Sequence, residues 1–270
     1  MQLDMTKGRP MPIIMRFFIP IFIGNMFQQF YNMVDSIIVG RYVGTEAFAA
    51  VGSTGTIMFL VLGFANGLAT GFTVLTSQRF GAKDEKGIRQ SVANAIFLSV
   101  IVSAVMTVFS MLSMKGLLHL LNTPSNIYLY AYDYIIIITG GTAAVCFYNL
   151  FSALLRAVGN SKAPLFFLIL SATLNIFLDL LFIIVFKWEV RGAALATIAS
   201  QAISAICCLI YILLKVKMLV PHRDEWRLKG SFAKRQLAIG FPMALQFGIT
   251  ASGTMIMQSA INRFGSDAIA

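Results

Sequence analysis

The chain contains few charged residues and very few side chains of the kinds that bind metals. Asp, Glu, Lys and Arg make up 12% of its 270 residues, about half of the ~25% that is usual in soluble domains. Histidine occurs only as His119 and His222, and the sequence has no HExxH motif of a zinc protease. The clustered carboxylates that a magnesium-dependent transferase needs are absent as well. We therefore expect neither an enzyme nor a protein with a resident cofactor.

Cysteine is also scarce. Cys146, Cys207 and Cys208 fall within apolar stretches, and their spacing is not that of a metal-ligand set. Buried thiols usually behave as small apolar side chains, so we assign these residues no chemistry.

Apolar residues are abundant instead, at 58% of the chain. A soluble core of this size does not need that much apolar surface, so we expect the surrounding solvent to be lipid. Seven apolar segments each reach the ~20 residues with which an α-helix crosses a bilayer, which predicts an all-α polytopic membrane protein. These segments are 12–39, 49–75, 91–114, 127–150, 164–186, 192–214 and 236–259.

The distribution of basic residues predicts the orientation. If the N-terminus is cytoplasmic, 16 of the 21 Lys and Arg residues fall on the cytoplasmic side, as the positive-inside rule requires. Topology thus explains the net charge of +10, and we expect no nucleic-acid partner. We place the protein in the plasma membrane (the inner membrane of a prokaryote) as a multi-pass protein.

The sequence begins a second time near its end. It reads FFIPIFIGNMFQQF around Pro20 and IGFPMALQFGIT around Pro242, which lies 222 positions later, and Arg41 and Arg263 are separated by the same distance. A repeat of this length is typical of a duplicated helical bundle. Because an even number of spans separates the two copies, both start on the same side of the membrane and the repeat is parallel.

This repeat predicts the domain organisation. Residues 1–214 would form a six-helix N-terminal lobe, 215–235 a cytoplasmic linker, and 236–270 the first helix of a C-terminal lobe. The linker contains Pro221 and Trp226, and we expect it either to lie on the headgroup surface as a short helix or to be solvated. Two such units would give roughly 440 residues and twelve helices. We interpret the chain as truncated and expect it to insert without transporting.

Two aspartates lie deep within the apolar spans. A charge there costs at least ~2.5–3.5 kcal/mol, so Asp35 and Asp179 should face a cavity or a partner. Polar residues recur at helical spacing around them and also in the sixth span. The three stripes are Asn25, Gln28, Gln29, Asn32, Asp35 and Ser36; Ser171, Asn175 and Asp179; and Thr197, Ser200, Gln201 and Ser204.

The stripes predict an ion site. Carboxylate, amide and hydroxyl oxygens suit a hard cation, and a carboxylate can take a proton instead. We predict a sodium or proton site with four members, Asp35, Asn175, Asp179 and Thr197. Alternatively, these groups only hydrogen-bond across helices. That interpretation suits Asn175 and Thr197 taken alone, but packing does not require the charges of the aspartates.

Other positions are candidates for a substrate cavity and for helix motion. Pro20 can open a backbone bond in the first span and act as a hinge. The ladder of Gly63, Gly67 and Gly71 in the second span predicts close helix packing. The candidate cavity-lining residues are Asn25, Gln28, Gln29, Asn32, Asn66, Thr70, Gln201 and Gln246.

Several motifs, in order along the chain, are similar to those of a known family. The segments are FYNMVDSIIVGRYVG, TSQRFGAKD, LLRAVGNSKAP, LNIFLD and GAALAT. Together they resemble the multidrug and toxic compound extrusion (MATE) transporters along essentially the whole chain. The resemblance implies a twelve-helix monomer of two lobes that exports organic cations by alternating access, in exchange for sodium ions or protons.

The resemblance also implies roles for particular residues. In one branch of the family the N-terminal lobe carries a cation site, and its members match the four residues predicted from the stripes. Pro20 matches a first-span proline proposed to bend during transport. Met257 occupies the repeat position of Asp35, so a coupling site confined to the N-terminal lobe is plausible.

A second function within the same superfamily stays open. A flippase of lipid-linked oligosaccharides or other polar lipids would line its cavity with several cationic side chains to hold phosphate. The spans carry almost no deep Lys or Arg, which favours the exporter.

Overall fold

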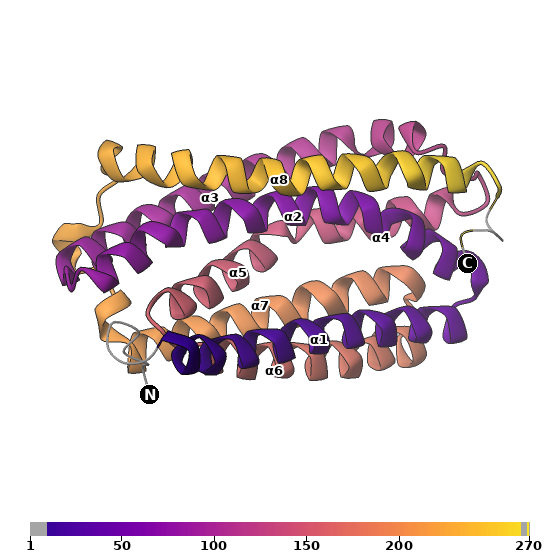
Figure 1. Cartoon of the computed structure of the whole chain (residues 1–270). Helices are drawn as coiled ribbons and strands as arrows, with labels where there is room; N and C mark the ends of the chain where they lie inside the picture. The colour runs from indigo at the N-terminus through magenta and orange to yellow at the C-terminus, as the bar shows by residue number, and fades with distance from the viewer. Residues whose placement is uncertain (1–9, 266–268, 270) are drawn as a thin grey trace.

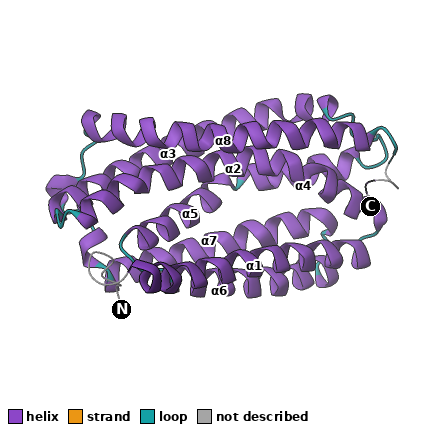
Figure 2. Ribbon diagram, in the orientation of Figure 1, coloured by secondary structure: helices purple, strands orange, loops and turns teal. Residues whose placement is uncertain are grey.

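The computed structural model describes residues 10–265 and residue 269, and this part of the chain is helical without strands (Figure 2). The all-α fold expected from the sequence is confirmed. Within these described residues, six helices are long and apolar enough to cross a membrane, or seven if one bent pair counts as a single span. The helices are α1 (Pro10–Tyr42), α2 (Thr45–Gly81), α3 (Glu85–Leu120), α4 (Tyr128–Gly140), α5 (Thr142–Ala157), α6 (Lys162–Asp179), α7 (Glu189–Lys215) and α8 (Gly230–Asn262).

The helices form two layers joined by a crossing helix. Figure 1 shows α1, α6 and α7 along one side of the bundle and α2, α3 and α8 along the other, with α5 running between them. Helix α2 is central, because it packs against α3, α4, α5 and α8. The first residues of α1 and α8 lie at the same end of the bundle (Figure 1), as a parallel repeat requires.

The fourth span, expected over residues 127–150, is bent. It consists of α4 and α5, which bend by 49° at their junction. A Cβ atom at Gly141 would lie 2.4 Å from the Ile198 side chain on α7, so only glycine lets α7 approach the bend this closely. The two helices together are long and apolar enough to form the one span expected over 127–150, and the bend lies where Gly140 and Gly141 interrupt the apolar stretch.

The fifth span changes its helix type part-way along. Helix α6 ends at Asp179, and a π-helical segment, Leu180–Val185, continues it. Helices of this type are rare and often lie at functional sites. The span therefore places one of the two deep aspartates at the junction of two backbone geometries.

Close packing of the glycine ladder is confirmed, and the partner helix is α8. A Cβ atom at Gly67 would lie 2.7 Å from the Cα atom of Ala244, and one at Gly71 would lie 2.2 Å from the Cα atom of Gly240. Such distances between backbones are possible only without side chains, and this contact stabilises helix pairs in lipid. The helix that follows the linker is thus seated directly on the N-terminal bundle.

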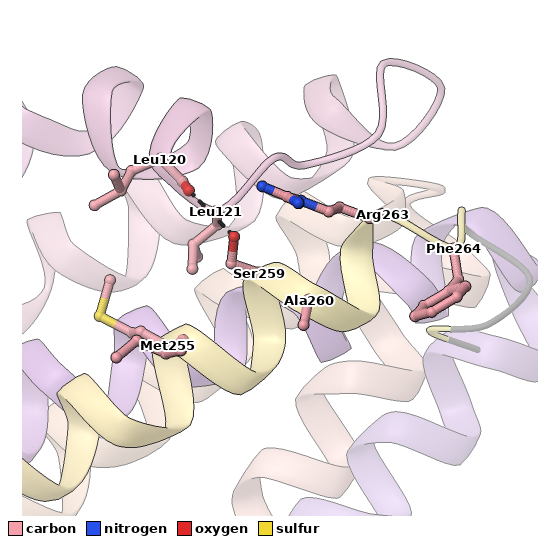
Figure 3. A pocket seen from close by; sticks show the side chains of 8 residues that line it. Leu120, Leu121, Met255, Ser259, Ala260, Arg263 and Phe264 are labelled. Carbon is pink, nitrogen blue, oxygen red and sulfur yellow. Dashed lines mark hydrogen bonds between the residues drawn. The ribbon is translucent and has the colours of Figure 1, made fainter.

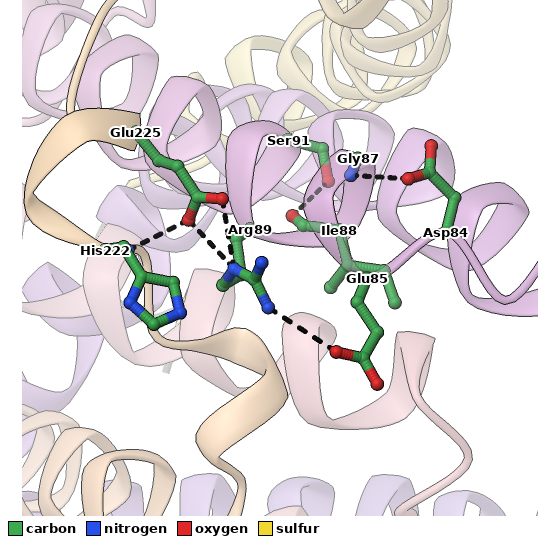
Figure 4. A network of polar contacts seen from close by, with 8 residues as sticks. All are labelled: Asp84, Glu85, Gly87, Ile88, Arg89, Ser91, His222 and Glu225. Atoms are coloured by element: carbon green, nitrogen blue, oxygen red, sulfur yellow. Dashed lines mark hydrogen bonds and ion pairs between the residues drawn. The ribbon is translucent and has the colours of Figure 1, made fainter.

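The segment between α7 and α8 is attached to α3 by buried polar contacts. Glu225 is 4% exposed and accepts a hydrogen bond of 2.9 Å from Arg89 Nε and another of 2.9 Å from the His222 amide. Figure 4 shows these contacts and the ion pair between Arg89 and Glu85. Two short 3₁₀ turns, Lys217–Leu219 and Arg223–Glu225, lie in this segment, and its exposed Trp226 packs edge-on against Phe97.

Amides on α3 and α8 complete this attachment. Asn94 Oδ1 accepts a hydrogen bond of 2.9 Å from the Lys229 amide just before α8 begins. Gln236 Nε2 donates to the carbonyl oxygens of Phe72 and Ser91 at 3.0 and 2.8 Å. These bonds explain why α8 begins at Gly230, six residues before the span expected from 236.

We expect Gly71→Ala to separate α2 from α8, because the new methyl group would overlap the backbone at Gly240. Overpacking of this kind costs about 1–3 kcal/mol, which a lower thermal unfolding temperature in detergent would report. Gly63→Ala is the matched control, since its methyl group would meet only the Phe247 side chain at 3.3 Å. Equal unfolding temperatures for the two variants would contradict the close contact.

We expect the Arg89–Glu225 ion pair to stabilise the protein at neutral pH and not in acid. Burial raises the pKa of the Glu225 carboxyl, but hydrogen bonds from the His222 amide and Arg89 outweigh it, so the pKa lies below its usual range. Such a carboxylate contributes stability above its unfolded-state pKa of about 4.3, and this is lost as the pH falls through the folded-state pKa.

Glu225→Gln should therefore cost about 2 kcal/mol at pH 7, below the ~3–5 kcal/mol of a fully buried pair, since Arg89 keeps Glu85 at 3.6 Å. Unfolding measured across pH should show the difference from wild type shrinking below about pH 4. Glu85→Gln should have little effect, because the Glu85 side chain is 73% exposed. A cost for Glu225→Gln that persists in acid would refute the role of the charge.

Candidate functional site

Two buried carboxyl groups meet in the interior of the bundle. Asp35 on α1 is 8% exposed and Asp179 at the end of α6 is fully buried, and the two carboxyls lie within electrostatic range of one another. Among the described residues, no donor reaches Asp35 Oδ1 or either carboxyl oxygen of Asp179. Burying such groups as unpaired anions is very costly. Two adjacent carboxyls in this position are therefore unfavourable as a pair of unpartnered anions.

An amide and a hydroxyl from neighbouring helices accompany the carboxylates. Asn175 lies one helical turn before Asp179 on α6, and its Nδ2 donates to Thr197 Oγ1 on α7 at 3.4 Å. The Thr197 hydroxyl in turn donates to the Ala193 carbonyl at 3.1 Å. Asn175 Oδ1 is left buried without a donor among the described residues. The hydrogen bond thus fixes the amide so that its oxygen remains available as a ligand.

Two tyrosines complete the surroundings of the pair and were not predicted from the sequence. Tyr31 lies four residues before Asp35 on α1, and Tyr134 is on α4; they are 9% and 2% exposed. Both phenols lie within electrostatic range of both carboxyls. Tyr31 could have been predicted, because a spacing of four residues places it on the same helix face as Asp35. Tyr134 carried none, because it is one of four tyrosines in the run YLYAYDY and only the fold selects it.

The structure brings some of the predicted cavity residues close to this site and leaves others apart. Gln28 and Gln201 lie beside Tyr31, and Gln201 is buried with its Oε1 lacking a donor among the described residues. Pro20 lies inside an unbroken α1. The remaining candidates have no contact with the carboxyls in the described contacts: Asn25, Gln29 and Asn32 are exposed on α1, Asn66 and Thr70 are half-buried on α2, and Gln246 is exposed on α8.

A larger hollow lies elsewhere, between the end of α3 and the end of α8. It has a volume of about 550 Å³ and is lined mainly by apolar side chains, with Arg263 at one end. Figure 3 shows it together with the contact of 3.4 Å between the Ser259 hydroxyl and the Leu120 carbonyl. Within the described part of the chain, no carboxylate lines this hollow.

Comparison with protein families identifies the chain. The family model described as MatE matches residues 20–181, which is more than half of the sequence and runs from Pro20 to just past Asp179. The chain belongs to the MatE family. The match covers three of the four predicted ion-site residues, and Thr197 lies beyond it.

Relatives and solved structures agree with this membership. The chain is 31% identical over 269 residues to "Probable multidrug resistance protein YpnP" of Bacillus subtilis (strain 168), covering 98% of this chain and 59% of that protein. A multidrug resistance MATE family transporter of the MOP superfamily, solved facing outward, matches with a TM-score of 0.84 at 26% identity. Its alignment covers 90% of this chain and 54% of that one. The MatE chain described here thus spans about three fifths of the length of its curated relative.

The same lobe also matches an inward-facing structure. A MATE family transporter in that conformation has a TM-score of 0.82 at 24% identity, over 90% of this chain and 55% of that one. Both comparisons show the same fold for this part of the chain. The MatE chain is a multi-pass membrane protein.

We expect Asp179→Asn to raise thermal stability in sodium-free detergent at mildly alkaline pH. The amide cannot ionise, so it removes the repulsion between two neighbouring carboxyl groups that are buried without donors among the described residues. Asp133→Asn is the control, because Asp133 accepts 2.9–3.0 Å contacts from Arg191 and its loss should not stabilise the protein. If Asp179→Asn unfolds at a lower temperature than wild type, the carboxylate has a partner in the folded state.

Proposed function

We propose that this chain forms the ion-coupling lobe of a secondary active antiporter that exports organic cations in exchange for sodium ions or protons by alternating access. The observation that supports this most directly is the pair of buried carboxyl groups, Asp35 and Asp179, without donors among the described residues. The relative YpnP bears the name "Probable multidrug resistance protein", which is consistent with drugs as the exported cargo.

The coupling ion would bind where the carboxylates, the Asn175 amide oxygen and the Thr197 hydroxyl converge. These are hard oxygen ligands that suit sodium, and the two carboxylates alone suit a proton. In either case the ion would cancel charge that the interior cannot stabilise. Binding or release of the ion would therefore change the interactions of α1, because Asp35 and Tyr31 of this helix are part of the site.

Helix α1 is suited to respond to that change. Pro20 lacks a backbone N–H and weakens one helical hydrogen bond, so bending at this position is inexpensive. Much of the helix is exposed, including Phe22, Phe27 and Phe30, and its aromatic side chains could contact an organic cation through their π faces. Ion binding near the end of α1 and drug binding along it would then favour different conformations of this helix, so that one opposes the other.

The orientation proposed from the basic residues places the first residues of α1 and α8 in the cytoplasm, at the plasma membrane. In this orientation the ion pair of Arg89 with Glu225 lies on the cytoplasmic side. The flippase alternative is not favoured, because no lysine or arginine is fully buried among the described residues, whereas a polar-lipid cavity needs several cations.

The proposal is tested by efflux of a fluorescent organic cation from pump-deficient cells that express the whole reading frame. Wild type should lower cellular dye, whereas Asp35→Asn and Asp179→Asn should each lose most of the efflux at equal membrane abundance. Imposing a sodium gradient or a pH gradient on membrane vesicles identifies the coupling ion.

Asp133→Asn serves as the matched control, since it removes an aspartate that pairs with Arg191 away from the site and should leave efflux intact. If both site variants export as well as wild type, the carboxylates only support packing and coupling resides elsewhere. If wild type itself moves no dye, export of organic cations is the wrong function.

A further inference from the structure

A second polar cavity lies between α1, α5 and α6, and the ion-site proposal does not use it. Its volume is about 70 Å³, and its lining includes Pro20 and Gly24 from α1, Ser152 and Arg156 from α5, and Ser161 before α6. Drug-sized sites have volumes of ~300–1,000 Å³. This cavity therefore fits a small group and not an aromatic drug.

Arg156 is the charged residue of this cavity, and it has no counter-ion among the described residues. No ion pair or hydrogen bond to its guanidinium is found there. Its ionisable neighbours are Tyr148 and Cys208, which are ordinarily neutral. A half-buried guanidinium in a membrane helix normally pairs with an anion or with backbone carbonyls. The charge of Arg156 thus remains to be balanced.

The other polar groups of the cavity are also available for a ligand. Ser152 is 2% exposed, and its Oγ lies beside Tyr148 and Cys208 without a hydrogen bond of good geometry. Ser161 precedes α6, yet its hydroxyl does not cap that helix. Asn160 performs the capping instead, because its Oδ1 accepts from the Ala163 amide at 3.1 Å.

Ser161 lies at the N-terminus of α6, where the helix dipole favours the binding of an anion. Helix α6 has 18 residues, and the N-terminus of such a helix carries a partial positive charge that attracts anions. Pro164, in the first turn of α6, lines the same cavity. Arginine, two hydroxyls and a helix N-terminus therefore converge, and none of the described residues that line the cavity is a carboxylate.

We propose that this cavity binds a phosphate-sized anion, held by Arg156 and by the hydroxyls of Ser152 and Ser161. The planar guanidinium suits a phosphate because it can donate two parallel hydrogen bonds. The source of the phosphate is either the headgroup of an anionic membrane lipid or free phosphate. The cavity is lined by the last turns of α5 and the first turn of α6, and these lie at the end of the bundle where α1 begins (Figure 1). This is close to the depth of lipid headgroups if α1 begins at the membrane surface.

The bound anion would also contact the proline of α1. Pro20 and Gly24 belong to the lining, and Gly24 lies against the Leu168 side chain of α6. An occupied cavity would therefore favour the arrangement of α1 against α5 and α6 seen here, and a bend of α1 at Pro20 would open it. This inference does not depend on the ion coupled at Asp35 and Asp179.

The experiment measures anion binding to the purified full chain. Native mass spectrometry counts phosphatidylglycerol retained after transfer from mixed phosphatidylglycerol and phosphatidylcholine nanodiscs, and thermal unfolding in detergent measures the effect of inorganic phosphate. Wild type should retain one phosphatidylglycerol per chain. Arg156→Gln and Ser161→Val should weaken binding roughly tenfold or more, since each removes charge-assisted hydrogen bonds.

Lys162→Gln is the matched control, because it removes a basic charge at the same end of the bundle from an exposed position outside this cavity. It should retain the lipid, and Arg156→Lys, which keeps the charge, should bind better than Arg156→Gln. Stabilisation of wild type, but not of Arg156→Gln, by inorganic phosphate without lipid retention supports the same site with free phosphate as its source. Equal behaviour of wild type and Arg156→Gln with both probes overturns the proposal.

Discussion

The placement of two carboxyl groups side by side in the interior of a lipid-embedded bundle is the constraint on which the rest of the lobe depends. Each of the helices that surround Asp35 and Asp179 contributes a neutral polar group: Tyr31 from α1, Tyr134 from α4, Asn175 from α6, and Thr197 and Gln201 from α7. Neutral groups can orient a proton or a cation without replacing it. A lysine in any of these places would form a permanent ion pair and remove the need for an exchangeable ion.

Helix α2 contributes packing contacts to the bundle and none of the described polar groups around the carboxyls. Its small residues allow α8 to contact it backbone to backbone, and its other faces pack against α3, α4 and α5. The polar contacts of Glu225 and Gln236 hold α8 at the same place from the loop side. The layer of α2, α3 and α8 is therefore tightly bound, whereas α1 lies at the edge of the other layer with much of its surface exposed. The layer of α2, α3 and α8 is thus the rigid one, and α1 in the other layer has fewer contacts that would restrict its movement.

Much of this organisation could be predicted from the sequence. Apolar length gave the spans, and helical spacing grouped Asp35, Asn175, Asp179 and Thr197, because both signals are local. The features that were missed depend on contacts between distant residues. Ile198 packs against the bend at Gly141, and the pairing of Arg89 with Glu225 joins positions 136 apart in the chain. Tyr134 entered the site only because the bend and the packing of α4 select it from a run of tyrosines.

The π-helical segment after Asp179 changes the direction in which side chains of the fifth span point around the helix axis. Each residue of an α-helix turns the chain by about 100°, and a π-helical turn accommodates one extra residue within the same height. The far end of this span is held by aromatic contacts among Phe182, Phe186 and Trp188. Because residues 180–185 are π-helical, the rotation of the Asp179 carboxylate about the helix axis, relative to Phe186 and Trp188, differs from the one an uninterrupted α-helix would impose. A change of register within residues 180–185 would turn Asp179 toward or away from Asp35 without altering any residue of the site.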